Sequence, residues 1–155
     1  MKRVPLIPKE VYSLVERKRR ARWVAEKRAM LKLQDAQAAA FSLGSPGAGG
    51  SGGRSGPGDR VGKLALRVVE AEDNLETARK WENVWRMMDR AFPFETTKEG
   101  FTAGLLYDNS VPFQEIAAAC GVSKQLAMRW RDNWVCHAAL FAAGEGLIQI
   151  REAEG

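Results

Sequence analysis

The chain has 155 residues, of which 45% are hydrophobic, and carries a net charge of +5. This length predicts one domain with appendages. The sequence contains no run of about 18 apolar residues, and its N-terminus lacks an uninterrupted apolar segment, so we expect neither a transmembrane helix nor a secretory signal. A cytoplasmic protein without a membrane partner is therefore the expected class.

Cysteine and histidine are scarce in the chain, and its carboxylates show no spacing typical of a catalytic site. Cys120 and Cys136 lie on predicted helices outside any C-x-x-C pair, and His137 is the only histidine. Zinc sites need four ligands at suitable spacing, and a Cys–His nucleophile needs a different spacing from that of Cys136 and His137. We expect no catalytic residues, no metal and no cofactor, and hence a protein that is not an enzyme.

The N-terminal segment, residues 1–43, holds the basic character of the chain. Its first 35 residues include 11 Lys and Arg against 4 Asp and Glu, whereas the remainder is slightly acidic. From about Pro8 to Ala40 the composition favours one long helix, with no Gly or Pro after Pro8. A broken heptad seam is predicted along it, at Leu14, Ala21, Val24, Leu31 and Ala38.

A cluster of basic residues lies in the middle of this predicted helix. One interpretation is a patch that contacts nucleic-acid phosphates; the other is a solvated, charged helix surface. The candidate phosphate contacts are Arg17, Lys18, Arg19, Arg20 and Arg22.

Residues 44–58 are rich in Gly, Ser and Pro and predict a flexible linker. Asp59 is predicted to cap a second long helix over residues 59–92. Its apolar positions predict a seam at Val61, Leu64, Val68, Ala71, Leu75, Ala78, Trp81, Trp85, Met88 and Phe92. The linker allows the two long helices to fold back antiparallel, although each could instead pair with its copy in another chain. The aromatic end of the second helix is predicted to be core rather than a platform for stacking bases.

Residues 93–144 predict a head of three short helices. Pro93 ends the long helix, and Thr96 with Glu99 predicts a capping box for a helix from about Thr97 to Tyr107. Gly144 is expected to end the last helix, which leaves residues 145–155 as a tail.

Two helices in this head have the pattern of a helix-turn-helix. One apolar face is predicted at Phe113, Ile116, Ala117 and Cys120, and a second at Leu126, Ala127, Trp130 and Trp134. Between them, Gly121 suits a left-handed turn and Ser123 suits an N-cap. Two helices joined by such a turn are typical of this motif.

The outer face of the second of these helices carries the candidate DNA-contacting residues, Ser123, Lys124, Gln125, Met128 and Arg129. The first residues of a recognition helix enter the major groove, where Arg pairs with guanine and Gln with adenine. The alternative is a helical pair that only packs. Because few basic residues lie near this face, we expect phosphate contacts from the N-terminal helix, from a second copy, or from another DNA-bound protein.

The predicted fold is therefore all-α, a long antiparallel helical hairpin followed by a helix-turn-helix head. This layout resembles the RinA/ArpU-type phage transcriptional regulators. The marks of the resemblance are the glycine tract before Asp59-Arg60-Val61-Gly62, the start of the motif at Phe113-Gln114-Glu115-Ile116-Ala117, and a head similar to sigma-factor region 4. The chain departs from that pattern at Leu106-Tyr107, where an Arg-Tyr pair is usual. The resemblance implies a regulator of phage or prophage late genes in a bacterial host cell, with Lys124, Gln125 and Arg129 at the bases.

Three functions follow as hypotheses. The first is sequence-specific binding of double-stranded DNA to regulate transcription, with RNA polymerase and a second copy of the chain as further partners left open. The second is a DNA-packaging recognition subunit similar to a small terminase. The third is a coiled-coil interaction module that does not bind DNA.

Overall fold

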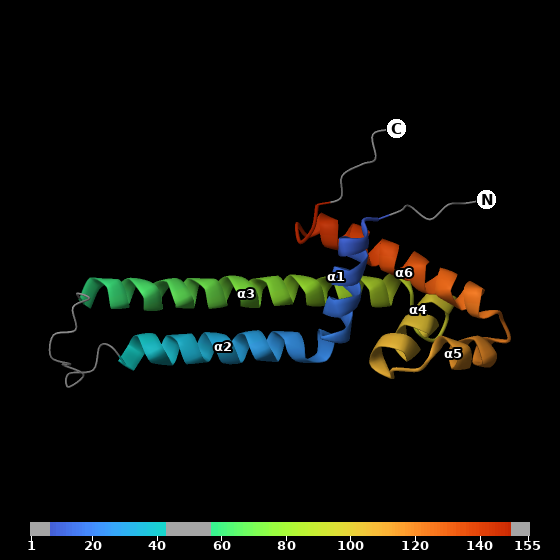
Figure 1. Cartoon of the computed structure of the whole chain (residues 1–155), viewed down its shortest axis with the longest axis horizontal. Coiled ribbons are helices and arrows are strands. Elements are labelled where there is room, and N and C mark those ends of the chain that lie inside the picture. The colour runs from blue at the N-terminus through green and yellow to red at the C-terminus, as the bar shows by residue number, and fades with distance from the viewer. Residues whose placement is uncertain (1–6, 43–56, 150–155) are drawn as a thin grey trace. The chain divides into compact units, whose positions relative to one another are not determined.

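The computed structural model describes residues 7–42 and 57–149, and these residues are all-α, which confirms the predicted fold class (Figure 1). The elements are α1 (Lys9–Arg20), α2 (Arg22–Ser42), α3 (Pro57–Ala91), α4 (Lys98–Ala103), the π-helical turn η1 (Gly104–Asp108), α5 (Phe113–Cys120) and α6 (Lys124–Gly144). Among the described residues, none of the helices combines the length and the hydrophobicity that crossing a bilayer requires.

The described residues divide into two compact units. Unit 1 comprises residues 7–23 and 80–149, and unit 2 comprises residues 24–42 and 57–79. The predicted division treated residues 1–43 as one segment separate from the head. In the structure, α1 instead belongs to the same unit as α4, α5 and α6.

The core of unit 1 is built on aromatic rings. Trp81 and Trp85 at the end of α3 stack with ring centroids 5.5 Å apart, and Trp85 stacks on Trp134 of α6 at 5.9 Å. All three rings are buried. This packing confirms that the aromatic end of α3 is core.

Helix α1 joins this core through apolar side chains, among which Val15 is fully buried, and through polar contacts. Val15 is fully buried in the cluster that contains the three tryptophans. The Tyr107 hydroxyl donates a hydrogen bond of 2.7 Å to Glu16, and Arg19 forms an ion pair with Asp108. Tyr107 and Asp108, the two η1 residues in these polar contacts with α1, are adjacent in sequence.

The predicted single helix from about Pro8 to Ala40 is wrong, because the helix is interrupted at Ala21. It contains no Gly or Pro after Pro8, so neither residue marks the break. Arg19 before the break binds Asp108, and Arg22 after it binds Glu82 and Asp89. These carboxylates lie 60 to 89 residues away along the chain, so the contacts that accompany the break are not visible in the local sequence.

Three predicted helix ends also differ from the structure. Thr97, rather than Thr96, caps α4, and its hydroxyl accepts a hydrogen bond of 3.1 Å from the Gly100 N–H. Asp59 lies inside the first turn of α3, which begins at Pro57 within the predicted linker. Gly144 is still helical, and Gly146, with φ +76°, is the left-handed residue that follows α6. The rest of the linker and the end of the tail lie outside the described residues.

Gly100 allows α4 to approach the end of α3 closely. A Cβ atom at this position would clash with the main-chain carbonyl oxygen of Phe92. Because backbone atoms cannot move aside cheaply, the turn after Pro93 depends on this glycine.

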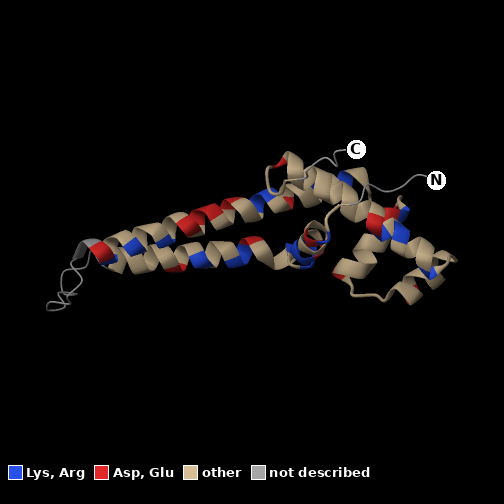
Figure 2. Ribbon diagram, turned by 45° about the horizontal axis from the view of Figure 1, so that its top comes forward, with Lys and Arg blue, Asp and Glu red and all other residues tan. Residues whose placement is uncertain are grey.

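In unit 2, α2 and α3 run side by side in opposite directions (Figures 1 and 2). The predicted seam of α3 is confirmed at Ala71 and Leu75, which are buried, whereas Val61 is exposed. The predicted seam of α2 is wrong. Val24, Leu31 and Ala38 are exposed, and the buried residues of α2 are Ala29 and Ala36. Both stripes repeat every seven residues, but the alanine stripe offers the smaller side chains for close approach of α3.

Candidate nucleic-acid interface

The turn between α5 and α6 has the local geometry that the sequence predicts. Gly121 adopts φ +66° and ψ 35°, which is the left-handed region, and the Val122 N–H donates to the Ala117 carbonyl at 3.0 Å. The Ser123 hydroxyl then accepts a hydrogen bond of 3.2 Å from the Leu126 N–H. Glycine tolerates the left-handed turn, and the serine satisfies a main-chain N–H at the start of α6. Both predictions are confirmed.

A small apolar cluster supports this turn from beneath. Its buried members are Ile116 and Ala117 of α5 and Ala127 of α6, and Val122 and Trp130 pack against them. Ala127 is fully buried in this cluster, so its methyl group faces α5 and not solvent. The cluster holds the first turns of α6 in place on the head.

The first turns of α6 present a polar face to solvent. Ser123, Lys124, Gln125 and Arg129 are exposed, and Met128 is partly buried. Apart from the cap at Ser123, no hydrogen bond or ion pair from the described part of the chain engages these side chains. Lys124, Gln125 and Arg129 are therefore available to a ligand.

Lys98 adds a cation near this face that the sequence did not single out. It is exposed at the first position of α4, and its Nζ atom lies 5.6 Å from the ring centre of Trp130 on α6. No sequence pattern links Lys98 to Trp130, because only tertiary packing brings α4 beside α6.

Arg131, by contrast, does not face solvent freely. Its Nε atom donates to Asp132 at 2.9 Å, and its guanidinium lies 4.8 Å from the ring centre of Phe113. Tyr12 of α1 also donates to Asp132, at 2.5 Å. Burial and this hydrogen bond to Asp132 raise the pKa of the Tyr12 hydroxyl, so it stays a neutral donor. The cluster ties α1 to the middle of α6.

Two of the five predicted phosphate contacts are excluded by their partners. Arg19 is buried and binds both oxygens of Asp108, at 2.6 and 2.8 Å. The side chain of Arg22 is buried between Glu82 and Asp89, at 3.0 and 2.9 Å. Burial alone would lower the pKa of Arg22, but the hydrogen bonds to these two carboxylates outweigh it and raise the pKa. Both arginines therefore neutralise carboxylates within the chain.

The other three basic residues of the cluster differ in their surroundings. Arg17 is exposed and Lys18 is partly buried, and neither has an ion pair within the described residues. Arg20 is exposed, but its guanidinium lies 3.9 Å from Glu16 and 5.4 Å from the ring centre of Tyr107. Arg17 and Lys18 are the residues of this cluster that remain uncommitted.

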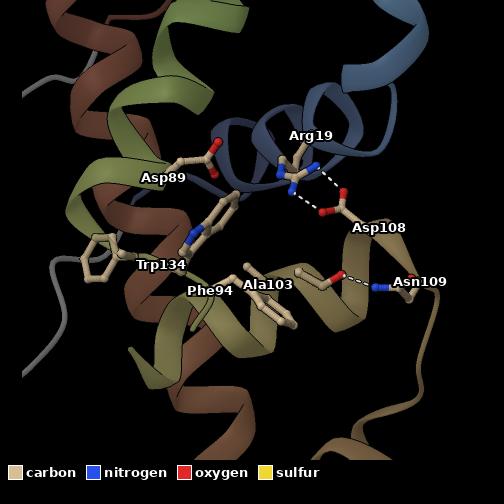
Figure 3. A pocket seen from close by; sticks show the side chains of 10 residues that line it. Arg19, Asp89, Phe94, Ala103, Asp108, Asn109 and Trp134 are labelled. Carbon is tan, nitrogen blue, oxygen red and sulfur yellow. Dashed lines mark hydrogen bonds and ion pairs between the residues drawn. The ribbon is translucent and has the colours of Figure 1, made fainter. Parts of the chain in front are cut away.

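A cavity of about 260 Å³ lies beside the Arg19–Asp108 pair (Figure 3). Phe94 and Trp134 line it, and Figure 3 shows Arg19 and Asp108 pointing toward one another at its edge. Its polar groups already have partners within the chain, since Asn109 donates to the Gly104 carbonyl and Asp89 accepts from Arg22, which does not line the cavity. We assign no ligand to this cavity. The described residues also contain no group of three or more His, Cys, Asp or Glu arranged to hold a metal ion.

Replacing Gly121 with alanine should lower the free energy of unfolding of unit 1 by about 1–2 kcal/mol, the cost of a left-handed residue with a Cβ atom. A Cβ atom there would meet no other atom within 4 Å, so the whole effect should come from the backbone. Urea denaturation measures it. Gly121→Asn is the matched control. It should lower the free energy of unfolding less than Gly121→Ala, because asparagine tolerates this conformation. Equal losses would contradict the explanation.

Comparison of the chain with protein-family models, with curated proteins and with solved structures finds no match.

Proposed function

We propose that the chain binds double-stranded DNA through the start of α6 and regulates transcription. The observation that carries this proposal is the exposed and uncommitted set Lys124, Gln125 and Arg129, which follows a tight turn at the N-terminus of a supported helix. A helix presented in this way suits insertion into the major groove, where Arg and Gln side chains distinguish guanine and adenine.

Phosphate contacts would come from the basic residues that the fold leaves uncommitted. In unit 1 these include Arg17, Lys18 and Lys124, and Lys98 is a further exposed cation whose contact is with the Trp130 ring. Each phosphate neutralised releases about one counterion, so a small number of cations implies moderate affinity with a shallow dependence on salt. By resemblance to RinA/ArpU-type regulators, the target would be a promoter of phage or prophage late genes.

The proposal is tested by selecting bound duplexes from a random library and then measuring affinity by fluorescence anisotropy at several salt concentrations. We expect an enriched sequence and a binding constant that falls as salt rises. The absence of salt-dependent binding to any duplex would refute the proposal. A ring-shaped oligomer seen by scattering would instead favour a packaging recognition subunit.

Within this proposal, Arg129→Ala should weaken binding to the selected site by about 1–3 kcal/mol, the value of a bidentate contact to a base. Lys124→Ala should weaken binding to all sequences and reduce the salt slope by about 1. Anisotropy titrations on the selected and a scrambled duplex separate the two effects. Arg86→Ala, at an exposed arginine of α3, is the matched control and should change neither. If Arg129→Ala weakened both duplexes equally, Arg129 would be a phosphate contact only.

A further inference from the structure

The outer face of α6 does not end at Arg129. Successive residues differ by about 100° around a helix, so Asp132 points within about 20° of Gln125, about 40° of Met128 and about 60° of Arg129. These four residues are spaced i, i+3, i+4 and i+7. The recognition helix of homeodomains contacts the major groove with four residues at this spacing. Asp132 is therefore the fourth position of the face that would enter the groove.

Helix α1 marks the end of this face, because it packs on α6 just beyond Asp132 (Figure 1). By the same count, Val135 and Ala139 continue the face about one and two turns further along. Both are fully buried, in the cluster that also contains Val15 of α1. The side chain of Asp132, by contrast, is 43% exposed. The stripe that a duplex can reach thus runs from Lys124 to Asp132.

The carboxylate of Asp132 is held through one of its two oxygens. The Tyr12 hydroxyl of α1 donates to Oδ1, and Arg131 Nε donates to the same oxygen at 2.9 Å. Neither donor engages Oδ2. Two donors from different helices fix the orientation of the carboxylate before any ligand arrives, and such preorganisation favours precise recognition.

The charges around Asp132 are compatible with a polyanionic ligand. A carboxylate alone on this face would repel DNA phosphates. Arg131 forms an ion pair with Asp132 at 2.9 Å, so the two side chains together add no net charge. Lys124 and Arg129 are exposed on the same face and leave it positive. Asp132 can therefore lie in a groove without reversing the attraction to the duplex.

We propose that Asp132 determines base specificity by accepting a hydrogen bond from the amino group of cytosine through Oδ2. The proposal rests on the proposed binding of DNA by α6. In the major groove cytosine presents its N4 amino group as a donor, whereas guanine presents O6 and N7 and thymine presents O4, which are acceptors. A carboxylate has only acceptors, so it pairs with cytosine and repels guanine and thymine. Adenine fits less well, because its amino group lies next to the N7 acceptor.

Selection of duplexes from a random library, followed by anisotropy titration, tests this assignment. The sequence enriched by the wild type should contain a cytosine whose replacement weakens binding about tenfold, within the range for a specific base contact. Asp132→Asn should reduce this preference to about twofold or less, or shift it to adenine, which an amide recognises. The other enriched positions should stay the same. A change confined to one base pair is not the result of a general loss of folding.

A modified base tests the same contact with the wild-type chain. In a duplex with N4-methylcytosine at this position, the methyl group replaces the hydrogen that N4 donates in the major groove. Binding should weaken about tenfold, as for the replaced base. Equal affinity for the modified and unmodified duplexes would overturn the proposal.

Tyr12→Phe is the matched control, because it removes the hydrogen bond between α1 and Asp132 but keeps the carboxylate and its ion pair. It should still prefer cytosine by about fivefold or more. If Tyr12→Phe relaxed this position as fully as Asp132→Asn, the contact between α1 and α6 and not the carboxylate would set the choice, and the proposal would fail. The same sequence selected by the wild type and Asp132→Asn would overturn it and leave DNA binding by α6 intact. A wild type that binds no duplex would overturn both.

Discussion

Replacing Trp134 with alanine should lower the free energy of unfolding of unit 1 by about 3–5 kcal/mol, the cost of removing a large aromatic side chain from a packed core. Trp134 is 3% exposed and connects three segments of the unit. Its ring stacks on Trp85 of α3, lies 5.4 Å from the ring of Tyr107, and has the Arg19 guanidinium 5.9 Å from its centre. Alanine would leave a cavity and also remove the aromatic surface beneath a buried cation.

The measurement is urea denaturation followed by tryptophan fluorescence. All five tryptophans of the chain belong to unit 1, so the signal reports on this unit and not on unit 2. Trp130→Ala is the matched control. Trp130 is only partly buried, in the smaller cluster under the α5–α6 turn. Its replacement should therefore lower the free energy of unfolding clearly less than the replacement of Trp134. If the two variants lost equal stability, the stacked rings would not be the centre of the core.

Asp108→Asn should lower the free energy of unfolding by about 2–4 kcal/mol at neutral pH, because it leaves a buried guanidinium without its counter-charge. Arg19 is 4% exposed and donates to both oxygens of Asp108, and Trp23 Nε1 donates to the same carboxylate at 3.0 Å. Asparagine cannot accept both arginine hydrogen bonds. Asp89→Asn is the matched control, since the Asp89 side chain is 60% exposed and its ion pair with Arg22 should contribute about 1 kcal/mol or less.

The stability that Asp108 provides should depend on pH. Burial would raise the pKa of this carboxyl group, but the hydrogen bonds from Arg19 and Trp23 and the charge of Arg19 outweigh it and lower the pKa below 3.8. A carboxyl group with a lower pKa in the folded state stabilises the protein above its unfolded pKa and loses that contribution as pH falls through its folded pKa. The stability gap between the wild type and Asp108→Asn should therefore be constant above about pH 5 and shrink below pH 4. A gap that grew on acidification would contradict this assignment.

The candidate interface could be predicted from the sequence because its elements depend on local chemistry. A glycine tolerates the left-handed turn at residue 121, a serine caps the next helix, and the exposed side of α6 follows from its helical period. These features need only residues within a few positions of one another. The seam of α3 could be predicted in the same way.

The sequence could not show which arginines of the basic cluster are buried in ion pairs. Arg17, Arg19, Arg20 and Arg22 look alike in sequence, yet Arg19 and Arg22 are buried in ion pairs with carboxylates 60 to 89 residues away. The same contacts accompany the break at Ala21, which no glycine or proline announces. Lys98 beside α6 was missed for the same reason.

Helix propensity, periodicity and capping act over a few residues, so they were enough to predict that the chain is all-α, where most of its helices lie, and which polar residues begin α6. The packing of the folded chain was needed to show which arginines are buried, that α1 packs with the C-terminal helices, and which of two equal heptad stripes on α2 faces α3. Those outcomes depend on charge pairing and side-chain volume between segments far apart in the chain. Periodicity is the same for both stripes of α2, whereas the smaller volume of the alanines favours their packing against α3.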